Sequence, residues 1–506
     1  MEQKTTLIQK LEYVKGILAI AEKYDHAVNV LSYDQETICP PDAMEEQGEV
    51  WAFLNNQSYK LIKDQAFIEA AEYLYEHRGE LGEFDRVMAE QLHRNYVQTR
   101  NITPELQHEF MLTFNRAFVN WSKAREAGEY SLFAPSLKEV ADTNRRMIEL
   151  RGEDAAGKTA YDTLLDDYER GMTSEVLDEA FGACKERLIP LLEKIRRSPR
   201  KIRTDFLTRP VEEEQQVKMA KWLLKQMRFN FDRGAFTTSE HPFTANMGRF
   251  DTRVTTHYYP DRFLSSMYSI IHEGGHALFD QNQLQANFDH FIIGGKTLGM
   301  HESVSRFYEN RIGRSEAFAQ FVYPKVCECF PEAMEGVSQE DFYLALNAVQ
   351  PSLIRTEADE FTYTFHIIIR YEIEKALFAG EIKVEDIPAL WNRKYQEYLG
   401  VCPASDRDGV LQDVHWTSGF GYFPTYAIGN FYNAMYFNRM KQEVAVEESI
   451  REGNFEPVNS WMIGHVFAKA DRLSPKDWIR DITGREFTPK DFLDYLEEKY
   501  SGIYGL

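Results

Sequence analysis

Cysteine is scarce in this sequence, with five residues among 506. Their odd number and scattered positions exclude the dense disulfide framework of a small secreted domain and are typical of a reducing compartment. Cys327 and Cys329 form a C-x-C pair, but no second pair accompanies it, so two buried thiols are favoured over a thiolate metal site.

Long apolar runs are also missing, because no stretch of about 18 consecutive apolar residues occurs. Residues 1–8 contain neither the basic nor the apolar segment of a signal peptide. From these two absences we expect no membrane partner and a cytoplasmic protein.

Basic residues do not exceed acidic ones: 58 Lys and Arg stand against 80 Asp and Glu, a net charge of −22. Nucleic acids and anionic membranes attract basic surfaces, so this balance argues against either partner. Ser/Gly-rich linkers, low-complexity runs and repeats of fixed period are absent as well. A chain of this length can form one large domain or two or three smaller ones, and we predict a single domain over residues 1–506.

Helical periodicity dominates what is present. Leu7, Leu11 and Val14 recur at spacings of four and three, and comparable patterns run through residues 65–200 and 311–400. Residues 228–260 differ, since β-forming residues nearly alternate there and glycines interrupt them. The chain is therefore predicted to be mainly α, with one small antiparallel sheet.

The stretch Ser269–Phe279, directly after that sheet, contains the pattern H-E-x-x-H. On a helix His272 and His276 share one face, about 6 Å apart along the axis, so both rings can bind one metal ion. Glu273 between them can take a proton from a water at the open position of the metal. The pattern predicts a hydrolytic zinc site; the alternative is a structural helix whose histidines only satisfy hydrogen bonds.

Two glycines inside this stretch, Gly274 and Gly275, each cost a helix about 1 kcal/mol relative to Ala. We infer that a strand or a bound peptide passes close to the backbone there. This close approach favours the functional interpretation over the structural one.

A catalytic zinc needs a third protein ligand, and Glu302 lies 26 residues after His276 in a helix-compatible segment. This spacing allows one helix to end near Gly294–Gly295 and a second to return antiparallel. His301 is a rival ligand, but on a helix it points about 100° away from Glu302, which favours an outer contact to a ligand or to substrate. We predict His272, His276 and Glu302 as the metal ligands.

Further motifs follow one another in a fixed order. They are His241-Pro242-Phe243, Asp251-Thr252-Arg253-Val254-Thr255, His301-Glu302-Ser303, Ile354-Arg355-Thr356-Glu357-Ala358-Asp359 and Gly409-Val410-Leu411-Gln412-Asp413-Val414-His415-Trp416. With the H-E-x-x-H stretch, this series resembles the carboxypeptidase Taq family of zinc-dependent metallocarboxypeptidases. Ser32–Thr37 is similar to the W-D-Q-x-T of that family, with Tyr33 at the Trp position.

The resemblance implies a helical clamshell with two lobes around a long substrate channel. Residues 1–80 are expected to form a helical lid, and residues 228–430 the active-site core. The resemblance also implies a homodimer and one Zn²⁺ per chain. Cobalt or manganese could replace zinc, because selectivity follows geometry and availability as well as ligand type.

A carboxypeptidase must hold a free C-terminal carboxylate, which a planar guanidinium binds through two hydrogen bonds. Arg355 and Arg253 are the candidates. The alternative for both is a structural ion pair with a nearby Asp251, Glu357 or Asp359. His241 could contact the substrate or simply end a strand.

An oxyanion forms when water attacks a peptide carbonyl, and it needs a hydrogen-bond donor. The resemblance assigns this part to His415 and to Tyr422 or Tyr426, whereas aromatic packing is the alternative for each tyrosine. Gln412, Asp413 and Trp416 are expected to orient His415.

These expectations together predict a zinc-dependent carboxypeptidase that releases single amino acids from peptides with a free C-terminus, with Glu273 as general base. An oligopeptidase or dipeptidyl carboxypeptidase is the alternative within the same class. From a different class, the chain could be an inactive, zinc-stabilised peptide-binding protein, although such a protein has no need of Glu273.

Overall fold

Helices make up most of the protein in the computed structural model, which describes residues 2–292, 297–469 and 471–506. The helices of the first half are α1 (Glu2–Thr37), α2 (Met44–Ile62), α3 (Gln65–Glu76), α4 (Glu83–Thr99), α5 (Pro104–Ala127), α6 (Ala134–Arg151), α7 (Ala160–Tyr168), α8 (Ser174–Arg197) and α9 (Glu213–Gln226). Those of the second half are α10 (Phe263–Gln281), α11 (Gln285–Asp289), α12 (Leu298–Arg306), α13 (Glu316–Cys329), α14 (Gln339–Leu346), α15 (Tyr363–Phe378), α16 (Ile387–Leu399), α17 (Pro424–Met440), α18 (Val446–Arg451), α19 (Glu456–His465), α20 (Pro475–Thr483) and α21 (Lys490–Tyr504). The mainly α prediction is confirmed.

A single small sheet lies among the described residues, formed by β1 (Gly234–Thr238), β2 (Thr244–Gly248) and β3 (Asp251–Thr256). The strand order is β1-β3-β2; β2 pairs with β3 antiparallel, whereas β1 pairs with β3 parallel. The prediction of an antiparallel sheet is therefore wrong for β1. The strand β3 lies between the two earlier strands in the sheet. An alternating pattern predicts that a segment is a strand, but it does not predict which strands lie next to it.

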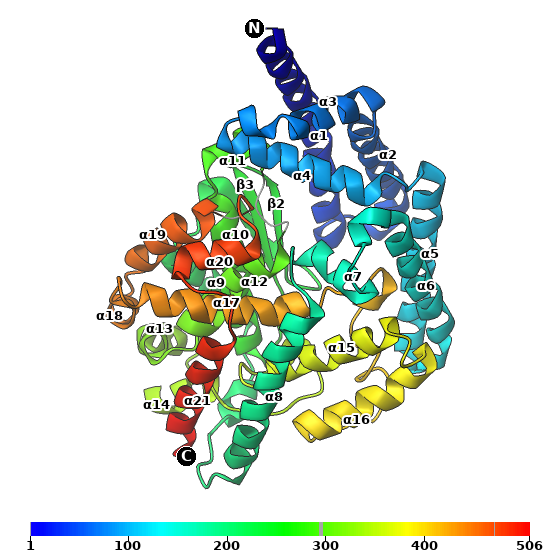
Figure 1. The fold of residues 1–506 in the computed structure, drawn as a ribbon. Coiled ribbons are helices and arrows are strands. Elements are labelled where there is room, and N and C mark those ends of the chain that lie inside the picture. The colour runs from blue at the N-terminus through cyan, green and yellow to red at the C-terminus, as the bar shows by residue number, and fades with distance from the viewer. Residues whose placement is uncertain (1, 293–296, 470) are drawn as a thin grey trace.

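The sheet and the helices that follow it meet at the centre of the molecule (Figure 1). Helix α10 packs on β3 and α12, and α17 lies along the other side of α12. The predicted helix end near Gly294–Gly295 lies outside the described residues, but the H-E-x-x-H helix α10 already ends at Gln281. Helix α12 is thus held between α10 and the aromatic-rich α17.

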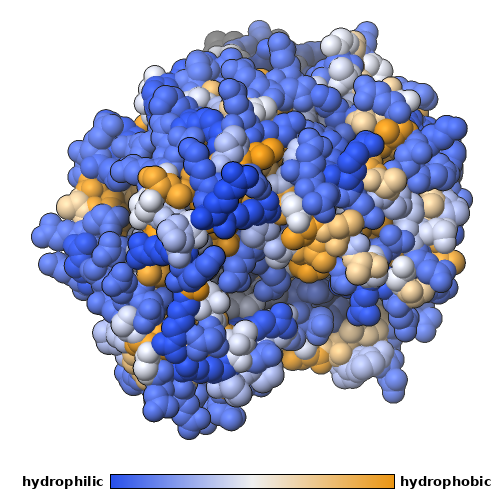
Figure 2. Space-filling model, turned by 90° about the horizontal axis from the view of Figure 1, so that it is seen from below, coloured by the Kyte–Doolittle hydropathy of each residue, from blue (hydrophilic) through white to orange (hydrophobic). Residues whose placement is uncertain are grey.

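Two groups of helices flank this centre (Figure 1). Helices α2, α5, α6, α7, α15 and α16 lie on one side, and α13, α14, α18, α19, α20 and α21 lie on the other. Seen from below, the surface is hollowed between the two sides, and apolar side chains gather beside the hollow (Figure 2). This arrangement agrees with the expected two-lobed clamshell.

The apolar interior is divided into two clusters. The large one extends from α5 to α21 and includes the inner faces of α10, α12 and α17. The small one gathers buried side chains of α1, α3 and α4, among them Val14, Leu74 and Met88, together with Ile292. The first helices therefore have an apolar core of their own. Among the described helices, none is long and apolar enough to cross a membrane.

Candidate metal centre and active site

Helix α10 presents His272, Glu273 and His276 at the centre of the molecule. Its other face is apolar, and Ile270, Ala277 and similar residues are completely buried against the neighbouring elements. This burial holds the helix in place, so the two histidines point in a defined direction. The H-E-x-x-H pattern and the apolar residues that flank it predicted this helix correctly.

The glycine pair of α10 does mark a close approach, but the neighbours are helices. A Cβ on Gly275 would lie 2.8 Å from Ser305 Cα of α12, and one on Gly274 would lie 3.0 Å from Met227 Cε. The prediction that a strand or a bound peptide lies against these glycines is therefore wrong. Gly275 instead lets α12 approach α10 closely enough to bring Glu302 to the two histidines.

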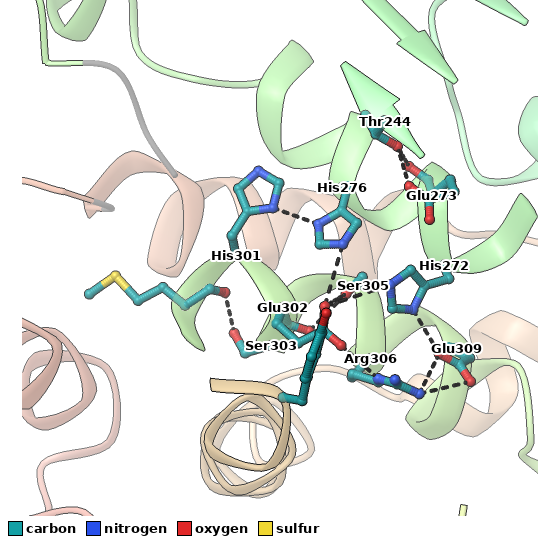
Figure 3. Close-up of polar contacts among 12 residues, drawn as sticks. Thr244, His272, Glu273, His276, His301, Glu302, Ser303, Ser305, Arg306 and Glu309 are labelled. Carbon is teal, nitrogen blue, oxygen red and sulfur yellow. Dashed lines mark hydrogen bonds and ion pairs between the residues drawn. The ribbon is translucent and has the colours of Figure 1, made fainter. Parts of the chain in front are cut away.

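Three potential ligand atoms converge between α10 and α12 (Figure 3). Glu302 Oε2 lies 3.6 Å from His272 Nε2 and 3.5 Å from His276 Nε2. All three ligand atoms lie within 4.8 Å of one another, which is compatible with one ion at their centre. The structure thus brings together the three residues that the sequence singled out.

Glu309 holds His272 from behind. Its carboxylate lies 2.8 Å from His272 Nδ1. Glu309 is part of a π-helical segment, η7 (Phe307–Ile312), that continues α12. Arg306 donates to Glu302 Oε1 at 2.8 Å and to both oxygens of Glu309. Burial raises the pKa of Glu309, but Arg306 and His272 outweigh it and lower that pKa to about 2. Glu309 is therefore ionised and fixes the orientation of the imidazole.

Glu309 was not predicted from the sequence, although its spacing carries a signal. Glu302, Arg306 and Glu309 are spaced i, i+4 and i+7, so they share one face of a helix. An acidic residue on the face of a predicted ligand is a reasonable partner for a histidine ligand.

His276 has its own outer contact. Its Nδ1 lies 2.5 Å from Nδ1 of His301, whose ring stacks on it with centroids 4.5 Å apart, and His301 Nε2 lies 3.4 Å from Asp280 Oδ1. If Nε2 of His276 offers its lone pair to a metal, its Nδ1–H donates to His301, and His301 then carries its proton toward Asp280. His301 thus lies behind His276 and outside the set of three ligand atoms. Asp280 was not predicted.

The donor set fits zinc. Two imidazole nitrogens and one carboxylate oxygen are the ligands of many catalytic zinc sites, and they leave further coordination positions open. Each histidine also has a polar group on its other nitrogen, which such ligands usually require.

Glu273 lies on α10, the helix that also carries His272 and His276 (Figure 3). Thr244 of β2 donates its hydroxyl to Glu273 Oε2 at 2.7 Å and lies 2.9 Å from the backbone carbonyl of Glu273. The carboxylate is buried, and this burial raises its pKa. A raised pKa makes a carboxylate a better proton acceptor. Thr244 was not predicted, because only the packing of the sheet on α10 brings it there.

A second polar cluster contains His415, Tyr422 and Tyr426. His415 Nε2 lies 3.1 Å from the Tyr426 hydroxyl, and the His415 and Tyr422 rings lie 5.1 Å apart. Burial lowers the pKa of His415 to about 4, so the ring is neutral at neutral pH. Burial, aided by the charge of Glu302, raises the pKa of the Tyr422 hydroxyl.

Arg355 is buried beside this cluster. Its Nε and Nη2 donate to Asp413 Oδ1 at 3.0 and 2.9 Å, and its Nη1 donates to the Tyr363 hydroxyl at 3.2 Å. The charge partner is Asp413 rather than Glu357 or Asp359. Each terminal nitrogen still retains a second N–H, because a guanidinium carries two on each.

Tyr363 connects the two parts of the site. Its ring lies under Arg306, with the guanidinium carbon 3.9 Å from the ring centroid, while its hydroxyl accepts from Arg355. Arg306 in turn contacts Glu302. Arg355 lies 4.7 Å from the ring centroid of Tyr426, so a chain of contacts through Arg306, Tyr363 and Arg355 joins Glu302 to the His415 cluster.

Arg253 and His241 are held elsewhere. Arg253 on β3 pairs with Asp251 at 2.8 Å and lies 5.0 Å from the ring of Tyr33 in α1, so it links the sheet to the first helix. His241 is exposed in the connection between β1 and β2. The ion-pair alternative describes the contacts of Arg253.

Known proteins of similar sequence are metallopeptidases and carboxypeptidases. A model of the carboxypeptidase Taq (M32) metallopeptidase family matches residues 13–500. Carboxypeptidase 1 of Bacillus subtilis (strain 168) is 37% identical over 485 residues, which cover 96% of this chain and 96% of that protein. Thermostable carboxypeptidase 1 of Pyrococcus furiosus is 33% identical over 504 residues, covering 98% and 99% of the two chains.

Solved structures are similar over the whole length. The M32 carboxypeptidase from Deinococcus radiodurans R1 superposes with a TM-score of 0.93 at 29% identity, covering 99% of this chain and 100% of that one. Metallocarboxypeptidase 1 of Trypanosoma cruzi superposes with a TM-score of 0.92 at 29% identity, covering 97% and 99%. The similarity therefore includes both lobes and the centre between them.

Proposed function

The chain belongs to the carboxypeptidase Taq (M32) metallopeptidase family and is a hydrolase of peptide bonds, and from this premise we propose that it uses zinc to release single C-terminal amino acids. The observation that carries the proposal is the convergence of two histidine Nε2 atoms and one Glu302 oxygen beside the buried Glu273. Since the family is one of peptidases, an inactive binding protein is no longer a competing interpretation.

His272, His276 and Glu302 would hold one zinc ion, with cobalt or manganese as possible substitutes. When bound there, zinc supplies Lewis-acid activation of water and of the scissile carbonyl. Glu309 and His301 keep the two imidazoles in the tautomers that direct Nε2 toward the centre.

Glu273 acts as the general base. Its carboxylate takes the proton from the attacking water and then hands it to the leaving amine. Thr244 keeps one oxygen in place through its hydroxyl, which leaves the other free for proton transfer. Burial supports this role because it raises the pKa of the carboxyl.

The His415 cluster stabilises the developing oxyanion. Neutral His415 and the Tyr422 and Tyr426 hydroxyls are hydrogen-bond donors that lie close to one another. Donors of this kind act most strongly when they are fixed before the reaction begins.

Arg355 is the proposed clamp for the substrate carboxylate. Asp413 fixes its guanidinium from one side, and the remaining N–H groups can form two hydrogen bonds to a carboxylate. Arg253 and His241, held at the sheet, would contact more distant parts of a peptide.

The length of the released product separates this proposal from its alternative. We expect one free amino acid per turnover from an N-blocked peptide, measured by mass spectrometry. Release of dipeptides or internal fragments would instead identify a dipeptidyl carboxypeptidase or oligopeptidase.

Glu273→Gln tests the mechanism. The variant should keep about one zinc per chain and lose roughly three or more orders of magnitude in kcat, because the amide cannot take a proton. Zinc content and amino-acid release are measured on both proteins, with the exposed Glu328→Gln as a matched control. Near wild-type kcat in Glu273→Gln would refute the general-base assignment.

The remaining parts of the proposal concern the whole molecule. Residues 1–80 form a lid, the enzyme works in the cytoplasm, and two copies form a homodimer. The separate apolar core of α1, α3 and α4 supports the lid. Analytical ultracentrifugation tests the dimer, since a monomer at micromolar concentration contradicts it.

A further inference from the structure

A buried carboxylate outside the proposed catalytic groups accepts three hydrogen bonds. Glu374 of α15 is 1% exposed. Its oxygens accept from the Tyr161 hydroxyl at 2.7 Å, from Trp416 Nε1 at 2.7 Å and from the Gly421 backbone N–H at 2.9 Å. A buried carboxylate is costly unless it is satisfied in this way.

The positions of two of these donors are informative. Trp416 directly follows His415, and Gly421 directly precedes Tyr422. Glu374 therefore binds both ends of the short segment 416–421, at the residues adjacent to two proposed catalytic side chains.

The same segment is pressed against α7. Gly421 has a φ of +89°, and a Cβ there would lie 2.9 Å from the backbone carbonyl carbon of Leu164. Tyr161, the third donor to Glu374, lies on the same helix as Leu164. Glu374 thus ties the segment to α15 and α7 together.

The imidazole of His415 packs on the ring of Phe423, with centroids 4.4 Å apart, but has little polar support. Its Nε2 faces the Tyr426 hydroxyl, but its Nδ1 is 3.9 Å from the nearer Asp413 oxygen, too far for a hydrogen bond. The position of the ring therefore depends on where the backbone at His415 and Trp416 is fixed.

We infer that Glu374 is a positioning residue that sets the locations of His415 and Tyr422 through the segment between them. The inference rests on the proposed function, in which those two side chains stabilise the oxyanion. Glu374 touches neither the substrate nor the reacting atoms in this account.

The chemistry of the carboxylate suits this part. Both oxygens of Glu374 accept hydrogen bonds, and all three partners are hydrogen-bond donors. A glutamine of nearly the same shape offers one oxygen and one NH₂ group, so at least one donor would lose its acceptor. Glu374→Gln therefore changes the fixing of the segment with little change in volume.

The test compares Glu374→Gln with Trp416→Phe and with the double variant. We expect kcat of Glu374→Gln to fall about 10- to 100-fold, as for other groups that orient a catalytic residue, with KM within about twofold and zinc content unchanged. Trp416→Phe should lower kcat less, because Gly421 remains bonded. In the double variant, the loss of kcat should be close to that of Glu374→Gln alone and smaller than the product of the two single losses, because both changes remove the same hydrogen bond.

Tyr161→Phe is the matched control. It removes one hydrogen bond from the same carboxylate but leaves both bonds to the segment, so kcat should stay near that of the wild type. An equal loss of kcat in Tyr161→Phe and Glu374→Gln would show general loosening and overturn the inference. If Glu374→Gln does not fold, Trp416→Phe decides: wild-type kcat with intact zinc overturns it.

Two further variants separate this inference from the function on which it rests. His415→Ala and Tyr422→Phe should both lose activity. If they retain the wild-type kcat, the proposed roles of these residues fail. If they lose it while Glu374→Gln retains it, only the positioning role fails.

Discussion

At the scale of single residues, the site depends on groups that hold other groups. Glu309 and His301 each bind the outer nitrogen of a proposed ligand, and Arg306 joins Glu309 to Glu302. Such outer contacts determine the direction of a ligand lone pair, so metal affinity should respond to residues that never touch the metal.

Replacing Glu309 by Gln should weaken zinc binding by about 10- to 100-fold. The amide removes the ionised acceptor beside His272 and leaves Arg306 with one carboxylate fewer. A titration with a competing chelator measures the affinity of the variant and the wild type. Glu328→Gln, on an exposed carboxylate of α13, serves as control. Equal zinc affinity in all three proteins would contradict the role of Glu309.

Glu169 predicts a dependence of stability on pH. Its carboxyl accepts from the Gly299 N–H in the first turn of α12 and from the Tyr432 hydroxyl, and burial raises its pKa to about 8. The folded state keeps this proton up to about pH 8, whereas the unfolded chain releases it near the ordinary carboxyl value. Stability from this group is therefore full at low pH and is lost as pH rises toward 8.

Glu169→Gln should remove that share of the pH dependence. Thermal denaturation of the wild type and the variant measures this pH dependence. A range from about pH 5 to about pH 9 includes the raised pKa of Glu169. The wild-type curve should fall more steeply with rising pH than that of the variant. Parallel curves would mean that Glu169 is ionised in the folded protein.

At the scale of elements, the site depends on how closely α10 and α12 approach. Gly275 faces the backbone of α12, which cannot move aside alone, whereas Gly274 faces the flexible end of Met227. Two adjacent glycines on one helix thus face neighbours of different rigidity.

Gly275→Ala and Gly274→Ala form a matched pair. Both gain about 1 kcal/mol of helix propensity, but overpacking against Ser305 should cost Gly275→Ala about 1–3 kcal/mol or more. We expect a lower melting temperature and weaker zinc binding for Gly275→Ala, and values near wild type for Gly274→Ala. Similar behaviour of the two variants would contradict the importance of this approach.

Patterns within one element were sufficient to predict the H-E-x-x-H helix and the strands, and the spacing of 26 residues from His276 was sufficient to single out Glu302. Contacts between distant elements could not be predicted in this way. Arg355 pairs with Asp413, 58 positions along the chain, rather than with an acidic neighbour in its own motif. β1 runs parallel to β3 because of the strand order, and periodicity carries no information on order. Thr244 reaches Glu273 only through the packing of the sheet on α10.

At the scale of the whole molecule, the net charge of −22 acts on the approach of substrate. A peptide with a blocked N-terminus and a free C-terminus is an anion, so the average field repels it. Salt screens this field, since the Debye length falls from about 30 Å at 0.01 M to about 8 Å at 0.15 M.

We therefore expect kcat/KM for an N-blocked neutral dipeptide to rise a few-fold between these two salt concentrations. A peptide of the same length with lysine side chains should show the opposite trend. Steady-state kinetics on both substrates provide the comparison. The same salt dependence for both would indicate that local charges at the site dominate.

The small apolar core of the first helices has a consequence for how this enzyme can change over generations. Among the described residues, the polar contacts of α1 with the sheet include His26 with the backbone carbonyl of Met247 and Asn29 with that of Asn246. If residues 1–80 act as the proposed lid, substitutions where α1 meets the sheet would alter how readily this lid opens without disturbing the large apolar core around the predicted ligands. With such a lid, selection can adjust the pace of substrate entry and the durability of the catalytic centre as two separate traits.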